Sequence, residues 1–310
     1  MRLLVVGAES LVGRALSRLF TAEQVEFREL PGEAPSAASK AGLLGALSLH
    51  SPSIVLNVTD VAGPVLAEQN AEAARACDEY HTVLPALLAD ACNSLGIPLL
   101  QHSTALVFDG LKAHPYTEDD AINPVGRYGK SKWQGECAIR QQTARFIILR
   151  TDWVFSALRP EYFTKLLAAC GEKPARLALM NLRFSPTPAP DVARVLLAIA
   201  RQIDCGAEPW GTYHYCAQPP LTQDAFAEHV LQEAAKLDPV LATCLAGFQI
   251  ERQPVLPPFV PNSVLNGQKL FETFGIKARS RGQDVADMLG VMYGKSTRQQ
   301  VQVSGGAQQY

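Results

Sequence analysis

The chain has 310 residues, of which 47% are hydrophobic and 19% are charged, a composition that is ordinary for a globular protein with a full core. With 28 basic and 30 acidic side chains, the net charge is −2, so no bulk attraction to nucleic acid or to an anionic membrane is expected. No apolar run reaches about 18 residues, so the sequence predicts no transmembrane helix.

The cysteines and histidines show no pattern of a disulfide framework or a metal site. The seven cysteines are odd in number and scattered, which fits reduced thiols in a cytoplasm. The six histidines lack zinc-binding spacings, so no metal is expected. The apolar run at residues 1–7 is too short for a signal peptide. We therefore expect a cytoplasmic protein.

The first half of the chain alternates short apolar segments with segments of helical periodicity. Strands are expected over residues 2–6, 25–30, 54–57, 97–101 and 145–150. Helices are expected over residues 10–21, 41–50, 71–94 and 128–142. This alternation predicts an α/β fold with a Rossmann-type, doubly wound parallel sheet.

The second half has denser loops, with proline-rich stretches at 184–190 and 253–261 and helices expected over 191–202, 223–236 and 282–292. It is interpreted as a smaller C-terminal α/β substrate lobe packed on the carboxyl edge of the sheet. We expect a dinucleotide-binding Rossmann domain over 1–155, to which some later segments return, and a region over 156–294 that is mostly the substrate lobe. The Gln/Ser/Gly-rich segment 295–310 is expected to be a disordered tail.

The first motif is a glycine turn between the first strand and the first helix. Gly7 can take the positive φ of a tight turn, and Gly13 lets the helix pack close to the sheet. The helix start at Ser10, Leu11 and Val12 would present free N–H groups to a pyrophosphate. Ser10 occupies the place of a middle glycine. The alternative is an ordinary strand-to-helix turn.

The end of the second strand bears on the form of the cofactor. Glu29 could accept hydrogen bonds from a ribose 2′-hydroxyl, whereas Arg28 would favour a 2′-phosphate. Since both residues are present, the choice between NAD and NADP stays open. A solvated charge pair at the strand end is an equal alternative.

A tyrosine and a lysine lie four residues apart in a segment of expected helix. Tyr128 and Lys132 would therefore share one helix face. A nearby ammonium stabilises a phenolate and lowers the pKa of the phenol, which makes the tyrosine a usable general acid for a carbonyl being reduced. The spacing alone is weak, and it gains weight from the segment that precedes it.

That preceding segment begins where the strand over 97–101 ends, at the carboxyl edge of the sheet, where ligands bind in open α/β folds. The hydroxyl of Thr104 or Ser103 could donate to the developing oxyanion of a carbonyl substrate. The alternative is a residue that caps the following turn.

Further segments follow in a set order, and together they resemble a known family. They are Val-Phe-Asp-Gly at 107–110, Pro115, Tyr116, Glu118, Pro124, Tyr-Gly-x-x-Lys at 128–132, Gly135, Glu136, Arg-Thr-Asp-Trp-Val at 150–154, Ser-Pro-Thr at 185–187, Asp-Val-Ala at 191–193, Pro-Asn-Ser-x-Leu at 261–265 and Lys-Leu at 269–270. The chain resembles extended short-chain dehydrogenases/reductases over about residues 1 to 292. Within them it is most similar to the dTDP-4-dehydrorhamnose reductases, the RmlD-like substrate-binding family.

The resemblance implies roles for individual residues. Tyr128 would be the general acid, Lys132 would hold the nicotinamide ribose and tune Tyr128, and Thr104 would polarise the substrate carbonyl. NADPH or NADH would deliver a hydride to the 4-keto group of a nucleotide-linked sugar. Contacts to the cofactor would come from Gly7, Ser10, Leu11, Val12, Gly13, Arg28, Asn57, Ser103, Tyr128 and Lys132.

The sequence also departs from the family pattern. Ala105 and Leu106 stand where the family has Asp-Tyr, and Val260 stands where it has arginine. Asn-Val-Thr at 57–59 replaces Asn-Ala-Ala, His81 replaces an asparagine, and Ser36 aligns loosely with an acidic residue near the adenine. A site built to hydrogen-bond a polar sugar discriminates strongly, so these changes bear on the substrate more than on the chemistry.

Two alternatives therefore stay open beside the reductase of a 4-keto nucleotide sugar. One is a reductase of a different keto compound. The other is a non-catalytic, dinucleotide-binding regulatory or interaction subunit, like the family's relative that regulates methionine adenosyltransferase. The expected partner is a small molecule, with no nucleic acid and no membrane, and a homodimer is common in similar proteins.

Overall fold

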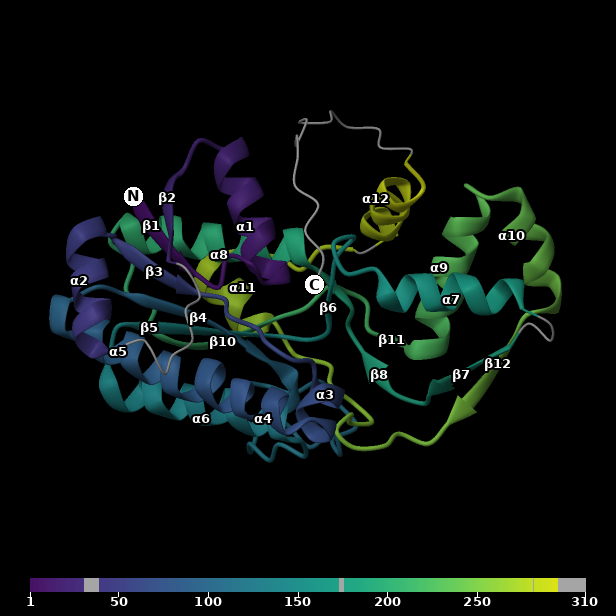
Figure 1. The fold of residues 1–310 in the computed structure, drawn as a ribbon, viewed down its shortest axis with the longest axis horizontal. Coiled ribbons are helices and arrows are strands. Elements are labelled where there is room, and N and C mark those ends of the chain that lie inside the picture. The colour runs from purple at the N-terminus through teal and green to yellow at the C-terminus, as the bar shows by residue number, and fades with distance from the viewer. Residues whose placement is uncertain (31–38, 173–175, 281, 295–310) are drawn as a thin grey trace.

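Six parallel strands form the sheet of the larger lobe in the computed structural model, which describes residues 1–30, 39–172, 176–280 and 282–294 (Figure 1). Their order is β10-β5-β4-β3-β1-β2. The strands are β1 (Arg2–Val6), β2 (Glu26–Leu30), β3 (Ile54–Asn57), β4 (Leu99–Thr104), β5 (Phe146–Thr151) and β10 (Gly211–Tyr215). The structure confirms the expected α/β class with a doubly wound parallel sheet.

Helices cover both faces of this sheet (Figure 1). One face packs against α1 (Leu11–Ala22), α8 (Ala189–Asp204) and α11 (Gln268–Phe274). The other face packs against α2 (Lys40–His50), α5 (Leu84–Leu95) and α6 (Arg127–Gln142). Successive strand residues point to opposite faces, and both faces are covered, so Leu3 and Leu4 are equally buried in separate core clusters. This explains the apolar runs of the inner strands β1, β3 and β5, whereas the edge strand β2 carries Glu26, Arg28 and Glu29 and is largely exposed.

The sheet has its switch point between β1 and β3. From β1 the chain proceeds to β2 on one side, and β3 pairs with β1 on the other. In open α/β sheets, ligands bind in the crevice at the carboxyl ends of the two strands where the order reverses. Here that crevice lies between the turn after Val6 and the loop after Asn57.

The smaller lobe is built around its own apolar cluster, which includes Phe163, Phe226 and Leu289. Its helices are α7 (Glu161–Gly171), α9 (Gln223–Ala235), α10 (Pro239–Cys244) and α12 (Gly282–Met292). Its short strands pair as β7 (Arg176–Met180) with β12 (Gln249–Gln253), β8 (Arg183–Phe184) with β11 (Leu221–Thr222), and β6 (Val154–Phe155) with β9 (Thr187–Pro188). The lobe lies beyond the carboxyl edge of the large sheet (Figure 1).

The chain passes between the two lobes more than once. After β6 and α7, the helix α8 and strand β10 return to the large sheet, and α11 does so again before α12. The domain boundary after residue 155 stays a prediction. The expected disordered tail over 295–310 and Ser36 lie outside the described residues. Within the described ranges, no helix is both long enough and apolar enough to cross a membrane.

The helix expected over 71–94 is interrupted. It consists of α4 (Ala71–Asp78), a π-helical turn over Glu79–Val83 and α5. The carbonyl oxygen of His81 in that wide turn faces α6, where a Cβ on Gly135 would lie 1.9 Å away from it. The short helix α3 (Pro64–Gln69), which precedes α4, was not expected from the sequence. The wide turn matters because it carries His81 to the site described next.

The fourth strand is displaced from its expected position over 97–101. β4 begins at Leu99 and continues to Thr104, because its parallel pairing with β5 extends to Thr104 opposite Thr151. Thr104 is therefore the last residue of a strand rather than part of the following loop.

Candidate active site

The turn after β1 is held by close backbone contacts. Gly7 has φ +84°, and a Cβ there would lie 2.6 Å from backbone atoms of Thr59. A Cβ on Gly13 would lie 2.2 Å from the carbonyl oxygen of Gly7. Both positions therefore require glycine if the turn is to keep this geometry.

Ser10 caps the helix that follows the turn. Its hydroxyl oxygen accepts a hydrogen bond from the N–H of Gly13 at 3.0 Å, and the residue is buried. Leu11 and Val12 occupy the first two helical positions, whose N–H groups have no acceptor within an α-helix. Ser10, Leu11 and Val12 all line the central cavity. The helix start can thus present N–H groups to an anionic ligand there.

The central cavity has a volume of about 410 Å³ and is lined by residues of both lobes. From the larger lobe it receives the amino end of α1 together with Ser103, Thr104 and Tyr128. From the smaller lobe it receives mostly apolar and aromatic side chains, among them Trp153, Tyr162, Met180, Phe184 and Phe259. Three separately predicted features, the helix start, the strand-end hydroxyls and the tyrosine, therefore meet in one cavity.

Tyr128 and Lys132 lie on α6, which begins under close constraint. The Glu68 carboxylate of α3 accepts a hydrogen bond from the N–H of Arg127 at 2.5 Å. A Cβ on Gly129 would lie 2.1 Å from the carbonyl oxygen of Leu106, so α6 packs tightly on the turn after β4. Lys132 Nζ lies 5.7 Å from the centre of the Tyr128 ring. The expected shared face of the two side chains is present.

Thr104 lies at the carboxyl end of β4. Its hydroxyl oxygen accepts a hydrogen bond from the N–H of Leu106 at 3.2 Å, as the capping alternative predicts. A hydroxyl that accepts one bond still has its own hydrogen to donate. Because Thr104 also lines the cavity, capping and ligand contact are compatible here.

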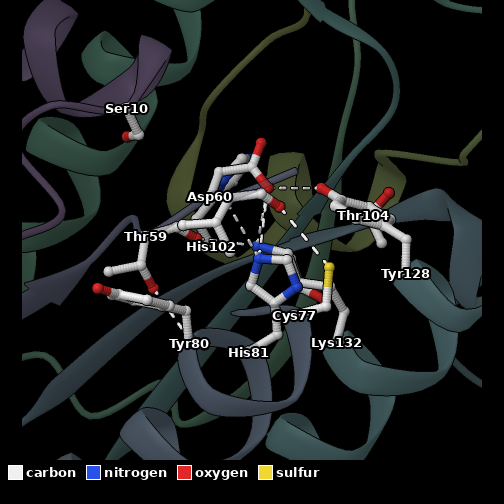
Figure 2. Close-up of polar contacts among 12 residues, drawn as sticks. Ser10, Thr59, Asp60, Cys77, Tyr80, His81, His102, Thr104, Tyr128 and Lys132 are labelled. Carbon is white, nitrogen blue, oxygen red and sulfur yellow. Dashed lines mark hydrogen bonds and ion pairs between the residues drawn. The ribbon is translucent and has the colours of Figure 1, made fainter. Parts of the chain in front are cut away.

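Asp60, which no sequence motif indicated, lies at the centre of the site. The Tyr128 hydroxyl donates a hydrogen bond to Asp60 Oδ1 at 2.8 Å, and Lys132 Nζ lies 3.4 Å from the same oxygen (Figure 2). Lys132 Nζ also donates to the carbonyl oxygen of Thr59 at 2.9 Å. Asp60 follows a buried strand by three residues at the carboxyl edge of the sheet, and this position was the available signal.

The electrostatics around Tyr128 differ from those expected for a Tyr-Lys pair. Burial raises the pKa of Tyr128 well above its usual value, and the charge and hydrogen bond of Asp60 raise it further. Burial also acts to raise the pKa of Asp60, but the Lys132 charge, first of all, and the Tyr128 hydrogen bond act against it, and that pKa is lowered. The site therefore holds a protonated phenol against an ionised carboxylate.

His81 supports Tyr128 as a neutral side chain. The N–H of Val61 donates to His81 Nε2 at 3.3 Å, so Nε2 is an acceptor and Nδ1 carries the hydrogen. Nδ1 lies 3.1 Å from the Ser131 hydroxyl, which donates to the Tyr128 carbonyl oxygen. Burial and Lys132 lower the pKa of His81 well below its usual value, although Asp60 opposes them. The His81 ring meets the Tyr128 ring edge-on, with centres 5.2 Å apart.

Two predicted cofactor contacts bond to other parts of the protein. The Asn57 amide donates to Gln101 Oε1 at 2.8 Å, and its oxygen accepts from the Thr59 hydroxyl at 2.8 Å. The Ser103 hydroxyl donates to Glu136 Oε1 at 2.6 Å. Both side chains order the sheet edge. Ser103 lines the cavity, but Asn57 is not among the residues that line it.

Arg28 and Glu29 at the end of β2 point to different places. Glu29 accepts a hydrogen bond from the Ser17 hydroxyl at 2.6 Å and lines a surface cavity beside the glycine turn, together with Arg14 and Arg18. Arg28 instead lines a separate depression at the other end of the strand. The structure thus brings Glu29 to the turn and leaves Arg28 away from it.

The departures from the family pattern fall in different environments. Ala105 is fully buried in a small apolar cluster, whereas Leu106 and Val260 line the cavity. Val260 also packs on Gly110, where an added Cβ would lie 2.5 Å from the Val260 Cβ. The cavity is therefore apolar at Leu106 and Val260.

Two buried polar atoms of cavity-lining residues have no hydrogen-bond partner in the described part of the chain. They are His102 Nδ1 and the Tyr162 hydroxyl. His102 Nε2 lies 2.8 Å from the Thr151 hydroxyl, which leaves only Nδ1 unpaired. Buried polar atoms normally find partners, so these two atoms are suited to contact a bound ligand.

A family model described as the RmlD substrate binding domain matches residues 1–293. A protein from Sinorhizobium fredii named dTDP-4-dehydrorhamnose reductase is 31% identical over 199 residues, and the match covers 61% of this chain and 64% of that relative, just under two thirds. One of the same name from Aggregatibacter actinomycetemcomitans is 27% identical over 284 residues, which cover 89% of this chain and 94% of the relative.

Solved structures agree with this assignment at the level of the fold. A dTDP-4-dehydrorhamnose reductase from Clostridium acetobutylicum has a TM-score of 0.76 at 23% identity, and the match covers 94% of this chain and 99% of that one. One from Bacillus anthracis, in complex with NADP, has a TM-score of 0.73 at 18% identity over 92% and 96% of the two chains. The resemblance inferred from the sequence is confirmed: the chain belongs to the RmlD substrate binding domain family.

Proposed function

We propose that the protein is an NAD(P)H-dependent reductase of a carbonyl compound, and that a 4-keto nucleotide-linked sugar is the first substrate to test. One observation carries the proposal: Tyr128 and Thr104 line the same cavity as the amino end of α1. An acid, a hydroxyl donor and an anion-binding helix start are the protein groups that such a reaction needs. The names of the relatives favour the sugar.

The residues at the cavity fit a nicotinamide dinucleotide. The close approaches at Gly7 and Gly13 bring α1 to the switch point of the sheet, where its first N–H groups can hold a pyrophosphate. The unpaired His102 Nδ1 offers a further polar contact deeper in the cavity. When bound, the nicotinamide supplies the hydride that reduces the carbonyl carbon.

The protein's own groups handle the proton. Tyr128 donates its phenolic proton to the carbonyl oxygen, so the O–H bond of the phenol breaks as that of the product alcohol forms. Thr104 donates a hydrogen bond to the same oxygen. Lys132 would hold the nicotinamide ribose. Water then returns a proton to the Tyr128 phenolate.

Replacing the acid tests this function. Tyr128→Phe removes the proton donor and keeps the ring, so we expect the rate of NADPH oxidation with a 4-keto nucleotide sugar to fall by about 10²- to 10⁴-fold. The dissociation constant for NADPH, measured by fluorescence titration, should stay unchanged. Tyr293→Phe removes a phenol outside the cavity lining and is the matched control. Unchanged turnover in Tyr128→Phe would exclude the proposal.

The cofactor form is a separate question at the end of β2. Glu29 favours NADH, because its carboxylate can accept from a ribose 2′-hydroxyl, whereas Arg14 and Arg18 beside it favour the 2′-phosphate of NADPH. Titration of the purified protein with each cofactor decides between them. Binding of neither would end the reductase hypothesis.

A second candidate function follows from the contact at Tyr128. Because Asp60 already takes the hydroxyl hydrogen bond, the chain could bind a dinucleotide without turnover, as a regulatory or interaction subunit. That function predicts cofactor binding, no reduction of any nucleotide sugar, and a stable heteromeric partner in a pull-down. The reductase function predicts turnover by the purified protein alone. The oligomeric state is a separate question: a homodimer is common in similar proteins, and light scattering would test for one.

A further inference from the structure

Asp60 gathers three polar groups of the proposed active site on one carboxylate oxygen. Oδ1 accepts the hydrogen bond from Tyr128 at 2.8 Å, and Lys132 Nζ and His81 Nε2 lie 3.4 Å and 3.6 Å from it (Figure 2). The Asp60 side chain lines the cavity and keeps 44% of its surface exposed. It therefore connects a buried phenol to the space where a ligand would bind.

The contact from Tyr128 uses the only hydrogen that the phenol can give. To protonate a substrate, Tyr128 has to redirect this hydrogen from Asp60 to the carbonyl oxygen. A neutral carbonyl is a weaker acceptor than a carboxylate, because hydrogen bonds to ionised groups are roughly twice as strong. Transfer thus becomes favourable only as negative charge develops on the substrate oxygen.

The charges near the phenol also balance. The Lys132 ammonium by itself would favour the phenolate, but the Asp60 carboxylate lies in contact with both groups and opposes that effect. The two histidines nearby are neutral: burial and Lys132 lower the pKa of His102 to about 4, and the pKa of His81 is also depressed. Burial, first of all, raises the pKa of Cys77 to about 11, so its thiol stays protonated.

The titratable groups that face Tyr128 and Asp60 come from each element packed around them. They are Lys132 on α6, His81 on the π-helical turn, His102 on β4 and Cys77 on α4, with Glu68 and Asp78 adding charge around Cys77. Of these groups, only Lys132 is both charged and in contact with Asp60, the carboxylate that accepts the hydrogen bond from Tyr128. Burial raises the pKa of Tyr128 most, and this pair is the main charged influence beside it.

We propose that Asp60 is a positioning residue that controls proton donation by Tyr128: its carboxylate takes the hydroxyl hydrogen bond and cancels the charge of Lys132. This inference rests on the proposed reductase function for its kinetic consequence only. Its structural consequence is that Asp60 moves the ionisation of the phenol to a higher pH than burial alone does, and this shift can be measured without any substrate.

Asp60→Asn tests the proposal, because the amide oxygen can still accept from Tyr128 while the charge is lost. Ionisation of Tyr128 is followed by ultraviolet absorbance as the difference between each protein and its Tyr128→Phe counterpart. We expect the Tyr128 transition of the variant to move toward neutral pH by about 1 to 3 pH units. An unchanged transition would overturn the proposal.

Two further variants separate charge from structure. Asp60→Glu restores the carboxylate and should return the Tyr128 transition toward that of the unmodified protein. Asp119→Asn removes an exposed acid elsewhere in the chain and should leave the transition unchanged. If Asp60→Asn unfolds the protein, as judged by circular dichroism, Asp60→Glu still decides: a Glu variant that titrates near neutral pH contradicts the proposal.

The pH profile of kcat gives the kinetic test. A stronger acid donates its proton faster, so the kcat of Asp60→Asn at neutral pH should be at least about threefold higher than that of the unmodified protein. In the alkaline range the kcat of the variant should fall, because its phenol ionises there. The unmodified protein should hold its rate across that range. A shifted titration with no turnover in either protein would sink the reductase function alone, whereas an unshifted titration with normal turnover would sink the role of Asp60 alone.

Discussion

Ser10 replaces a glycine in the turn and still fits, because its side chain bonds inward. The hydroxyl accepts from the N–H of Gly13, so it caps α1 instead of projecting across the helix start. The neighbours Leu11 and Val12 remain at the cavity. A change at the middle of a glycine turn is therefore tolerable where the new side chain can serve as the cap.

Gly13 has no such freedom, because the turn leaves no room for a side chain there. A Cβ at position 13 would lie 2.2 Å from the Gly7 carbonyl oxygen, so Gly13→Ala must push α1 away from the turn. We expect a loss of about 1–3 kcal/mol in the free energy of unfolding, measured with urea, and a clear loss of NADPH affinity. Gly45→Ala is the control, because an added Cβ there meets nothing within 4 Å. It should reduce neither the free energy of unfolding nor the NADPH affinity.

The sequence indicated Tyr128, Lys132 and Thr104 as candidates, because their spacing and strand-end position are local patterns. It did not reveal Asp60, since the bond from Tyr128 to Asp60 joins residues 68 positions apart. This hydrogen bond forms only because α6 packs against the loop after β3. The same holds for Arg28 and Glu29. As neighbours in β2 they point to opposite faces of the strand, and the packing of β2 in the sheet decides which of them faces the glycine turn.

At the scale of elements, α6 is fastened to the sheet by a buried charge network as well as by apolar packing. Both oxygens of Glu136 accept hydrogen bonds from the Arg150 guanidinium, at 2.9 and 2.6 Å, and Oε1 also accepts from Ser103. The Arg150 guanidinium lies 5.2 Å from the centre of the Phe108 ring. Burial acts to raise the pKa of Glu136, but Arg150 and the hydrogen bonds outweigh it, so the pKa is lowered and the pair stays charged.

Breaking this pair should loosen the helix that carries Tyr128. Glu136→Gln leaves the Arg150 charge buried without its partner, so we expect a loss of about 3–5 kcal/mol in the free energy of unfolding, measured by denaturant titration. Glu23→Gln, which breaks an exposed pair with Arg201, should cost only about 0–1 kcal/mol. Equal costs for the two variants would contradict the role given to Glu136.

The periodicity of the sequence predicted five of the six strands of the sheet, but neither β10 nor every interruption of a helix. Strands β1 and β3 and helix α12 lie where they were expected, because runs of apolar residues set them locally. The π-helical turn at 79–83 was missed because it depends on the approach of α6 through Gly135. Periodicity gives the type of an element, whereas the packing of a neighbour decides where it breaks.

For the molecule as a whole, buried neutral histidines link stability to pH. Burial and Arg150 lower the pKa of His214 to about 3, and burial and Lys132 lower that of His102 to about 4. In the unfolded chain both rings take up a proton near pH 6.5. Below that pH the unfolded state binds more protons than the folded state, so folding loses stability as the pH falls toward 4.

We therefore expect the free energy of unfolding to be nearly level between about pH 6.5 and 8 and to decline steadily between about pH 6.5 and 4. Urea titrations across this range measure it. His214→Gln should flatten the decline, because it removes one ring that protonates only on unfolding. His50→Gln, which changes a histidine at the end of α2, should leave the slope as it is. Stability that stays level down to pH 4 would contradict this account.

The return of α8 and β10 to the large sheet also bears on how the chain folds as it is synthesised. When the first 155 residues have left the ribosome, β5 still lacks its neighbour β10, and the face that α8 and α11 cover is still open. Leu3, Val5 and Leu56 on that face would then be exposed to solvent and to other chains. The larger lobe can close only after α11 at Gln268–Phe274, and with it most of the smaller lobe, has been made.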